Sequence, residues 1–312
     1  MKLAKGERAF KENSLLSQYK KHYQLVLMLV PGIIILLLFH YVPMFGILIS
    51  FEDYKIQKGI FGSEWVWFEN FIELFTRHDF GKLISNTLSI SIYKILFGFP
   101  APIILALLLN EVRAQKTKKI IQTCTYLPHF FSWVVLAGIF KMVFSNTGPV
   151  NELLVSLGFN RVEFFSNGTA FRFIVIFTSI WQSVGWNAIV YLAALSGVDE
   201  SLYEAAYIDG ANRLKQALHI SIPCIVPTII TLLIMKLGTV LTAGYDQIYN
   251  LYNPTVYEVA DIIETFTMRK LNQMEYGIGT AAGLFKSVIS IILVMLTNKI
   301  SDKLSDGELG IM

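Results

Sequence analysis

The strongest constraint on this chain is a series of apolar stretches that are long enough to cross a lipid bilayer. A crossing helix needs about 20 mostly apolar residues. Unpaired backbone groups are costly in hydrocarbon, so such stretches fold as helices. The sequence therefore predicts an all-α integral membrane protein with six transmembrane helices, at about 24–50, 84–110, 124–144, 171–195, 224–244 and 277–298.

Composition supports a membrane protein and argues against both a nucleic-acid-binding protein and a metal site. The chain is 54% hydrophobic and 16% charged, with a mean hydropathy of +0.53, whereas about one quarter of the residues in soluble domains are charged. The net charge of +3 is spread between the apolar stretches, so no nucleic acid partner is expected. Cys124 and Cys224 lie far apart without nearby ligand residues, and no metal site is predicted.

Lysine and arginine in the connecting segments predict the orientation. The tail 1–23, the loops 111–123 and 196–223, and the tail 299–312 hold 14 of them, against seven in the connections on the other side. Basic residues accumulate on the cytoplasmic side. Both tails and the loop 196–223 are therefore expected in the cytoplasm, with the transmembrane domain covering 24–298 and the chain crossing the membrane several times.

The loop 196–223 is a polar module between two apolar stretches. "ESLYEAAYI" predicts a short helix, Asp209 and Gly210 a turn, and "ANRLKQALHISI" a second amphipathic helix that stops at Pro223. Small alanines let another backbone approach closely, and Glu204 offers a charge to a basic partner. The module is interpreted either as a docking element or as an interfacial loop packed against lipid.

The same loop resembles a known signature. Glu-Ala-Ala, three residues, Gly, nine residues and Ile-x-Leu-Pro mark the loop of ATP-binding cassette (ABC) importer permeases that couples them to their ATPases. Ile222 stands where the pattern has leucine. The resemblance implies a type I ABC importer permease in which the loop lies in a groove of the ATPase subunit. The residues assigned to this coupling role are Glu204, Ala205, Ala206, Asp209, Gly210, Ile220 and Pro223.

Other stretches resemble one branch of that family. Residues 31–75, 126–140 and 245–288 look like the LplB-like carbohydrate permeases, which are similar in core plan to the larger maltose importer permease. This implies an oligosaccharide substrate, uronate-containing glycans included, and transport by alternating access. The implied partners are a second homologous permease, two ABC ATPase subunits and an extracytoplasmic substrate-binding protein, within membrane lipid.

No catalytic or nucleotide-binding motif was found. The one Gly-Lys pair, Gly81-Lys82, is followed by Leu83, so the chain has no phosphate-binding loop of the Gly-Lys-Ser/Thr kind. The expectation is a transport subunit that is not an enzyme, with no cofactor of its own. ATP and magnesium would bind to the partner ATPases.

Three lysines lie near the middle of predicted spans: Lys94, Lys236 and Lys286. No aspartate or glutamate lies within the six predicted spans to neutralise them. A charged lysine facing lipid is costly, so each is expected to face the bundle interior, water or a partner. They either form a positively charged cavity for anionic sugars, or they bind backbone carbonyls, helix ends or acids of the second permease.

Two further stretches combine aromatic and amide side chains, as sugar sites do. They are "WQSVGWNAIVY" (181–191) and "AGYDQIYN" (243–250). The alternative is that these aromatics form the interfacial belt or pack the bundle. The substrate-contact candidates, in addition to the lysines, are Tyr93, Trp181, Gln182, Trp186, Asn187, Tyr245, Asp246 and Gln247.

Three rival functions stay open at this stage. A peptide or amino-acid ABC permease would share the signature loop. An ion-coupled secondary transporter should show inverted repeats and membrane acids, and neither was found. A membrane enzyme or scaffold should show converging polar groups. Separately, the aromatic segment 51–83 predicts either an interfacial helix or part of the surface on which a substrate-binding protein lands.

Overall fold

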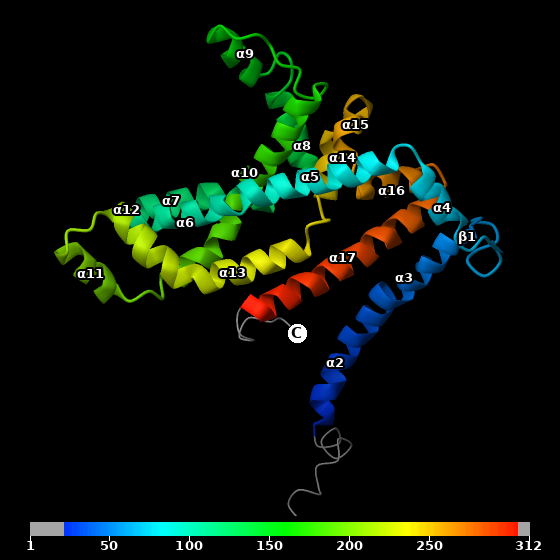
Figure 1. Ribbon diagram of the computed structural model, residues 1–312, viewed down its shortest axis with the longest axis horizontal. Coiled ribbons are helices and arrows are strands. Elements are labelled where there is room, and N and C mark those ends of the chain that lie inside the picture. Colours follow the sequence, from blue (N-terminus) through cyan, green and yellow to red (C-terminus); the bar gives the residue numbers. More distant parts are fainter. Residues whose placement is uncertain (1–21, 305–312) are drawn as a thin grey trace, which may run out of the picture.

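The computed structural model describes residues 22–304, so the predicted tail 1–23 and the end of the predicted tail 299–312 lie largely outside the described residues. Most of the long helices run roughly along one axis (Figure 1), with α11 (Glu200–Ile208) at one end and the strand β1 (Glu52–Asp53) at the other. Within the described part, five helices are long and apolar enough to cross a membrane, or up to six if a bent pair forms one span.

The five long helices match the predicted spans closely at most of their ends. Three of them are divided by local changes of helix type or a short break. In chain order, the five are α2 (Tyr23–Leu36) with η1 (Leu37–Tyr41), α3 (Val42–Met44) and η2 (Phe45–Phe51); α5 (Phe80–Gly98) with α6 (Pro100–Glu111); the undivided α10 (Gly168–Leu195); α12 (Arg213–Gln216) with η4 (Ala217–Ser221) and α13 (Ile222–Gly238); and the undivided α17 (Tyr276–Leu304).

The predicted third span, 124–144, differs from a single straight helix. The chain forms α7 (Gln115–Tyr126) and η3 (Leu127–Phe130), then turns by 107° into α8 (Trp133–Val143). Pro128 lies in η3, and the extended Ser132 begins α8 by accepting a hydrogen bond from the Val135 amide at 3.5 Å. A proline followed by a helix N-cap is a local stop-and-start signal that a hydropathy count does not detect.

The predicted helix end at Pro223 is wrong. The helix passes through this proline by widening to a π turn at η4, where the Ile222 amide donates to the Ala217 carbonyl, five residues back. The wider turn accommodates a residue that has no N–H and that crowds the preceding turn. The fifth span therefore begins at Arg213 and ends at Gly238, six residues before the predicted end at 244.

The segment 51–83 is mostly not the predicted interfacial helix. It begins with a short antiparallel pair, in which Glu52 of β1 lies opposite Trp65 of β2 (Glu64–Trp65). Within this segment, α4 (Glu69–Thr76) and the start of α5 are helical. The ring of Phe75 packs against that of Phe285 of α17, with the ring centroids 5.5 Å apart. Gly59, with a φ of +68°, lies between the two strands in the left-handed conformation that glycine tolerates.

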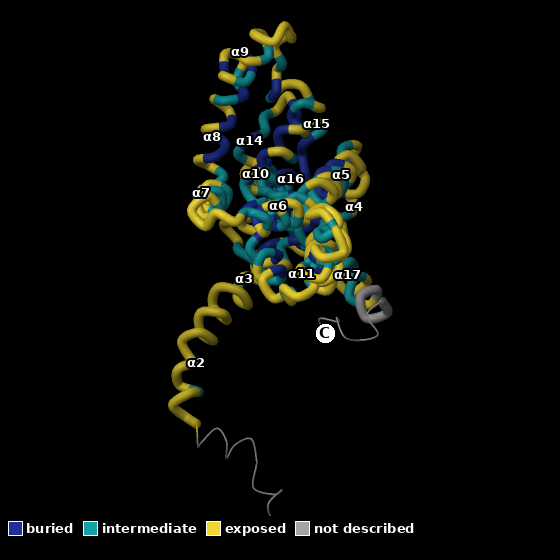
Figure 2. Tube along the Cα trace, turned by 90° about the vertical axis from the view of Figure 1, so that its left-hand side faces the viewer, coloured by how far each residue is buried: buried dark blue, intermediate teal, exposed yellow. Residues whose placement is uncertain are grey.

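Shorter helices surround the crossing of α10 with α5 and build the main apolar core. Figure 2 shows this buried region around α10, α14 and α16, whereas α2 is exposed along its length. Phe171, Ile174, Leu136 and Ile248 belong to one buried cluster. The shorter helices are α9 (Pro149–Ser156), α14 (Tyr245–Leu251), η5 (Pro254–Val256), α15 (Tyr257–Ala260) and α16 (Ile263–Asn272).

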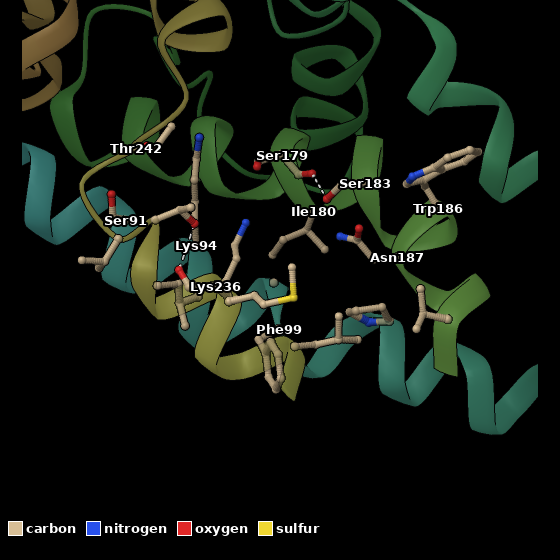
Figure 3. Close-up of a pocket in the computed structure, with 18 of the residues that line it drawn as sticks. Ser91, Lys94, Phe99, Ser179, Ile180, Ser183, Trp186, Asn187, Lys236 and Thr242 are labelled. Atoms are coloured by element: carbon tan, nitrogen blue, oxygen red, sulfur yellow. Dashed lines mark hydrogen bonds between the residues drawn. The ribbon is translucent and has the colours of Figure 1, made fainter. Parts of the chain in front are cut away.

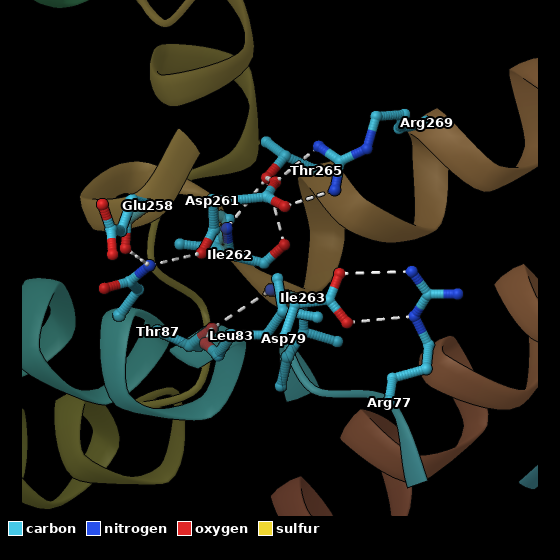
Figure 4. Close-up of polar contacts among 11 residues, drawn as sticks. Arg77, Asp79, Leu83, Thr87, Glu258, Asp261, Ile262, Ile263, Thr265 and Arg269 are labelled. Carbon is cyan, nitrogen blue, oxygen red and sulfur yellow. Dashed lines mark hydrogen bonds and ion pairs between the residues drawn. The ribbon is translucent and has the colours of Figure 1, made fainter. Parts of the chain in front are cut away.

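A polar network joins the connection between α15 and α16 to the bundle (Figure 4). The Asp261 carboxylate, in a residue that is 5% exposed, accepts hydrogen bonds from Thr265 Oγ1 at 2.7 Å and from Arg269. Its backbone carbonyl accepts from Asn86 Nδ2 at 3.2 Å. Asn86 in turn accepts from Arg172 Nη2 at 2.8 Å, so the network connects α5, α10 and α16.

We expect Asp261→Asn to lower the thermal unfolding temperature of the purified protein strongly. Removing one partner of a mostly buried ion pair leaves the Arg269 guanidinium unpaired, which costs about 3 kcal/mol. Differential scanning fluorimetry in one detergent measures the shift. Glu258→Gln is the control, because Glu258 pairs with Lys82 in an exposed bridge that is worth about 1 kcal/mol or less. Equal unfolding temperatures for the two variants would contradict the buried role of Asp261.

Candidate functional site

A cavity of about 330 Å³ lies between α5, α6, α10 and α13. Its lining carries two lysines, Lys94 and Lys236, and no aspartate or glutamate. Figure 3 shows Lys94, Lys236 and Asn187 around this one space, each on a different helix. The cavity is therefore a positively charged, partly polar space within the membrane-spanning bundle.

Lys94 is held in place by the chain itself. Its Nζ donates to the Ala243 carbonyl at 2.7 Å and to Gln247 Oε1. The Gln247 Nε2 donates to the Val175 carbonyl and to Thr178 Oγ1, both at 2.7 Å. Gln247 is 1% exposed and does not line the cavity. It therefore positions Lys94 from the buried side, away from the cavity.

Gly244 makes room for this arrangement. It has a φ of +93°, which L side chains rarely adopt, and a Cβ at this position would lie 2.8 Å from Lys94 Nζ. The turn after α13 therefore brings Ala243 and Gln247 to the lysine, because the glycine both reverses the chain and leaves space for the ammonium. This link between residues 149 positions apart is not visible in the sequence pattern.

Lys236 differs from Lys94 in having no partner. Its ammonium forms no hydrogen bond or ion pair with any residue in the described part of the chain. It lies in the last turn of α13, and its backbone carbonyl accepts hydrogen bonds from the helix cap at Thr239. Of the three predicted lysines, Lys236 is therefore the one whose charge is available to a ligand.

Lys286 lies outside the cavity lining and is already neutralised. It forms an ion pair with Glu264 of α16, and both side chains are less than one-fifth exposed. The predicted spans contain no acid, but α16 folds back along α17 and brings Glu264 to the lysine. Lys286 therefore matches neither predicted alternative, because its partner is an acid of the same chain that comes from a segment outside the predicted spans.

The polar face of α10 contributes two serines that were not among the predicted contacts, Ser179 and Ser183. Together with the predicted Asn187 they line the cavity and recur every four residues, which places the three on one face of the helix. Ser91 of α5 also lines the cavity, is 3% exposed, and its hydroxyl has no hydrogen-bond partner in the described chain. The i, i+4, i+8 spacing that these serines share with Asn187 on α10 is the signal that could have identified them.

The aromatic candidates divide between the cavity and the packing around it. Trp186 lines the cavity and stacks on His129 with ring centroids 4.6 Å apart. Trp181 instead packs edge-on against Phe140. Of the predicted contacts, the cavity lining brings together Lys94, Trp186, Asn187 and Lys236. It does not include Tyr93, Trp181, Gln182, Tyr245, Asp246, Gln247 or Lys286.

The loop 196–223 forms a compact turn at one end of the bundle (Figure 1). After α11, the Ala211 amide donates to the Ala206 carbonyl at 2.9 Å and the Gly210 amide to the Tyr207 carbonyl at 3.1 Å. This is a Schellman motif with the glycine at φ +76°. The predicted turn at Asp209 and Gly210 is confirmed.

Two contacts connect this turn to the long helices. The Tyr203 hydroxyl lies 2.9 Å from Ser221 Oγ in η4, and Arg213 pairs with Glu111 at the end of α6. The tip is apolar and open, since Tyr207 is 78% and Ile208 84% exposed. Tyr203 therefore connects α11 to the fifth span, and Arg213 connects α12 to the second.

Comparison with known proteins gives matches over nearly the whole chain. The family model described as binding-protein-dependent transport system inner membrane component matches residues 98–306. The polygalacturonan/rhamnogalacturonan transport system permease protein YteP of Bacillus subtilis is 45% identical over 303 residues, covering 96% of this chain and 94% of that protein. Protein LplB of the same organism is 44% identical over 292 residues, covering 93% of this chain and 92% of its own.

A solved structure is similar in both fold and sequence. It belongs to a bacterial ABC transporter involved in the import of the acidic polysaccharide alginate. The match has a TM-score of 0.85 and 41% identity, and covers 93% of this chain and 99% of the other. A second structure of a bacterial alginate ABC transporter, in complex with a pentasaccharide-bound periplasmic protein, matches with the same TM-score and 40% identity.

Proposed function

Because this chain belongs to the family of binding-protein-dependent transport system inner membrane components, we propose that it carries acidic oligosaccharides through the membrane. It is a multi-pass permease of an ABC importer for oligosaccharides. The preference for acidic sugars is the further step. It rests above all on one observation, the cavity lined by two lysines and by no carboxylate.

The chemistry of the lining suits such a substrate. A uronate carboxylate would pair with the free ammonium of Lys236, while the hydroxyls of Ser91 and Ser183 and the amide of Asn187 suit sugar hydroxyls. The Trp186 face offers an apolar surface to the C–H side of a sugar ring. The names of similar proteins agree in charge, since polygalacturonan and alginate are both polyuronates.

Partner proteins would supply the remaining subunits of the transporter. A second homologous permease would complete the pathway, and an extracytoplasmic binding protein would deliver the glycan. Two ABC ATPases, which bind ATP and magnesium, would dock on the loop 204–223 at the cytoplasmic face. The exposed Tyr207 and Ile208 support this, because apolar side chains at an aqueous loop tip favour burial against a protein. Both termini then lie in the cytoplasm of a bacterium.

Lys236→Gln is expected to reduce uptake of a de-esterified oligogalacturonate about tenfold, which corresponds to about 1.4 kcal/mol of lost pairing with the ammonium. The fully methyl-esterified oligomer of equal length has no charge, so its uptake should change little. Uptake by proteoliposomes containing the complete transporter measures both substrates. The ratio of the two rates isolates the charge from any general loss of activity.

The matched control is Lys141→Gln, because Lys141 is exposed on α8 and does not line the cavity. It should leave both rates unchanged. Lys236→Glu should reduce uptake of the acidic oligomer further than Lys236→Gln, since the cavity would then repel a carboxylate. An unaltered ratio in both Lys236 variants would reject the preference for acidic sugars and leave the importer assignment in place.

A further inference from the structure

A second pocket of about 420 Å³ lies at the far end of the bundle from α11, between the β1–β2 pair, α4 and the start of α17. Its lining contains five acidic residues and no basic one. Two of the acids have partners nearby: Asp53 pairs with Lys55 at 3.1 Å and Glu275 with Lys270 at 2.6 Å. The other three are Glu52, Glu69 and Glu73.

Glu52 forms the buried part of this pocket and has no hydrogen-bond partner for its carboxyl group. The residue is 0% exposed, and neither carboxyl oxygen accepts or donates a hydrogen bond within the described chain. Other mostly buried acids differ, since Asp261 has Arg269 and Glu264 has Lys286. An unsatisfied buried polar group costs about 1–3 kcal/mol, and more when it is charged. The carboxyl group of Glu52 therefore has no hydrogen-bond donor among the described residues.

Glu69 and Glu73 add negative charge at the pocket. They are separated by one turn of α4, both are exposed, and neither forms an ion pair with a described residue. Like charges at this spacing destabilise a helix by a few tenths of a kcal/mol. Together with Glu52 they give the pocket one buried and two exposed carboxyl groups. The two exposed groups would attract a cation, and the buried one would hold it.

We propose that this pocket receives a lysine or arginine side chain of the extracytoplasmic binding protein. The inference rests on the proposed function, which places this end of the bundle outside the cell, where a periplasmic partner approaches. Such a protein is present in the complex of a similar transporter. A side-chain cation suits the pocket better than a metal ion, because the described residues contain no group of three or more potential ligands close enough to hold one.

The test uses the complete transporter in nanodiscs and the binding protein whose addition stimulates the wild-type ATPase activity. Its affinity is measured by biolayer interferometry at low and high salt. Glu52→Gln should weaken binding about tenfold or more through faster dissociation, because a buried partner is lost. The double variant Glu69→Gln/Glu73→Gln should slow association several-fold and reduce its salt dependence, because the two exposed charges act by steering.

Glu64→Gln is the control, because Glu64 is an exposed acid on β2 that does not line the pocket. The inference would be overturned if both test variants bound the binding protein as tightly as this control does. It would also be overturned if the test variants lost the second permease on purification. The double variant decides the question if Glu52→Gln folds poorly, since its two side chains are exposed. If no binding protein stimulates the wild type, the proposed function fails first. If the wild type responds and the variants behave like the control, the pocket inference alone fails.

Discussion

Gly210→Pro is expected to abolish transport and to release the ATPase subunits while leaving the membrane domain folded. Gly210 has a φ of +76°, and its amide donates to the Tyr207 carbonyl. Proline fixes φ near −65° and has no N–H, so the turn between α11 and α12 cannot form. Because the loop would then no longer present Tyr207 and Ile208 to a groove, we expect transport to fall about 100-fold or more, equivalent to about 3 kcal/mol.

The measurement is a mild-detergent purification of the tagged chain with identification of the co-purifying proteins. The wild type should bring down an ABC ATPase and a second permease, and the variant the second permease alone. Gly158→Pro is a matched control, since Gly158 also has a positive φ of +85° and donates to the Val155 carbonyl. Gly158 follows α9 and is not part of the loop 196–223. Retention of the ATPase by Gly210→Pro would contradict the docking role.

Gly185→Ala is expected to have the largest effect on folding. A Cβ at this position in α10 would overlap with the carbonyl carbon and oxygen of Thr125 in α7, and would lie 2.8 Å from the Thr125 Cβ. Backbone atoms cannot move aside as a flexible side chain can, so α7 and α10 must separate. We expect a loss of about 3 kcal/mol, at the upper end for overpacking. Size-exclusion profiles and unfolding temperatures in detergent measure it.

Gly138→Ala controls for the change of residue type. Gly138 lies inside α8, and no atom lies within 4 Å of the position of an added Cβ. Alanine should therefore be tolerated or stabilise this helix by about 0.5–1 kcal/mol relative to glycine. If Gly185→Ala were as stable as Gly138→Ala, the close approach of α7 and α10 would not exist in the folded protein.

The three lysines that looked alike in the sequence have different environments in the folded chain. Lys94 is bound by Ala243 and Gln247, Lys286 is paired with Glu264, and the Lys236 ammonium has no partner among the residues that the structure describes. Lys94 bears out the interpretation that a buried lysine binds a backbone carbonyl, whereas Lys236 keeps the interpretation of a charged cavity open to test. Hydropathy alone could not separate them, because each partner comes from a segment distant in sequence.

Local signals in the sequence also had limits where proline was concerned. Pro223 predicted a helix end, but the structure accommodates it with a π turn and continues the helix. Pro128 lies inside the apolar stretch 124–144 that predicted a single span, yet the break of the third span follows it directly. Proline removes one hydrogen bond in either case, and whether the helix widens or stops depends on the packing of the neighbouring turns.

The sequence by itself determined the membrane class, most of the span positions and the turn at Gly210, because these depend on composition and residue spacing within short segments, and its signature loop resembled the family to which the chain belongs. Only the tertiary structure decided which lysine has no partner among the described residues, which candidates meet in the cavity, and that Glu52 is buried without a partner in the same part of the chain. These properties arise from contacts between segments that are distant in the sequence, such as Lys94 and Gln247, which lie 153 residues apart. Hydrogen bonds and ion pairs form between atoms a few ångströms apart in space, so they follow the fold and not the order of the chain.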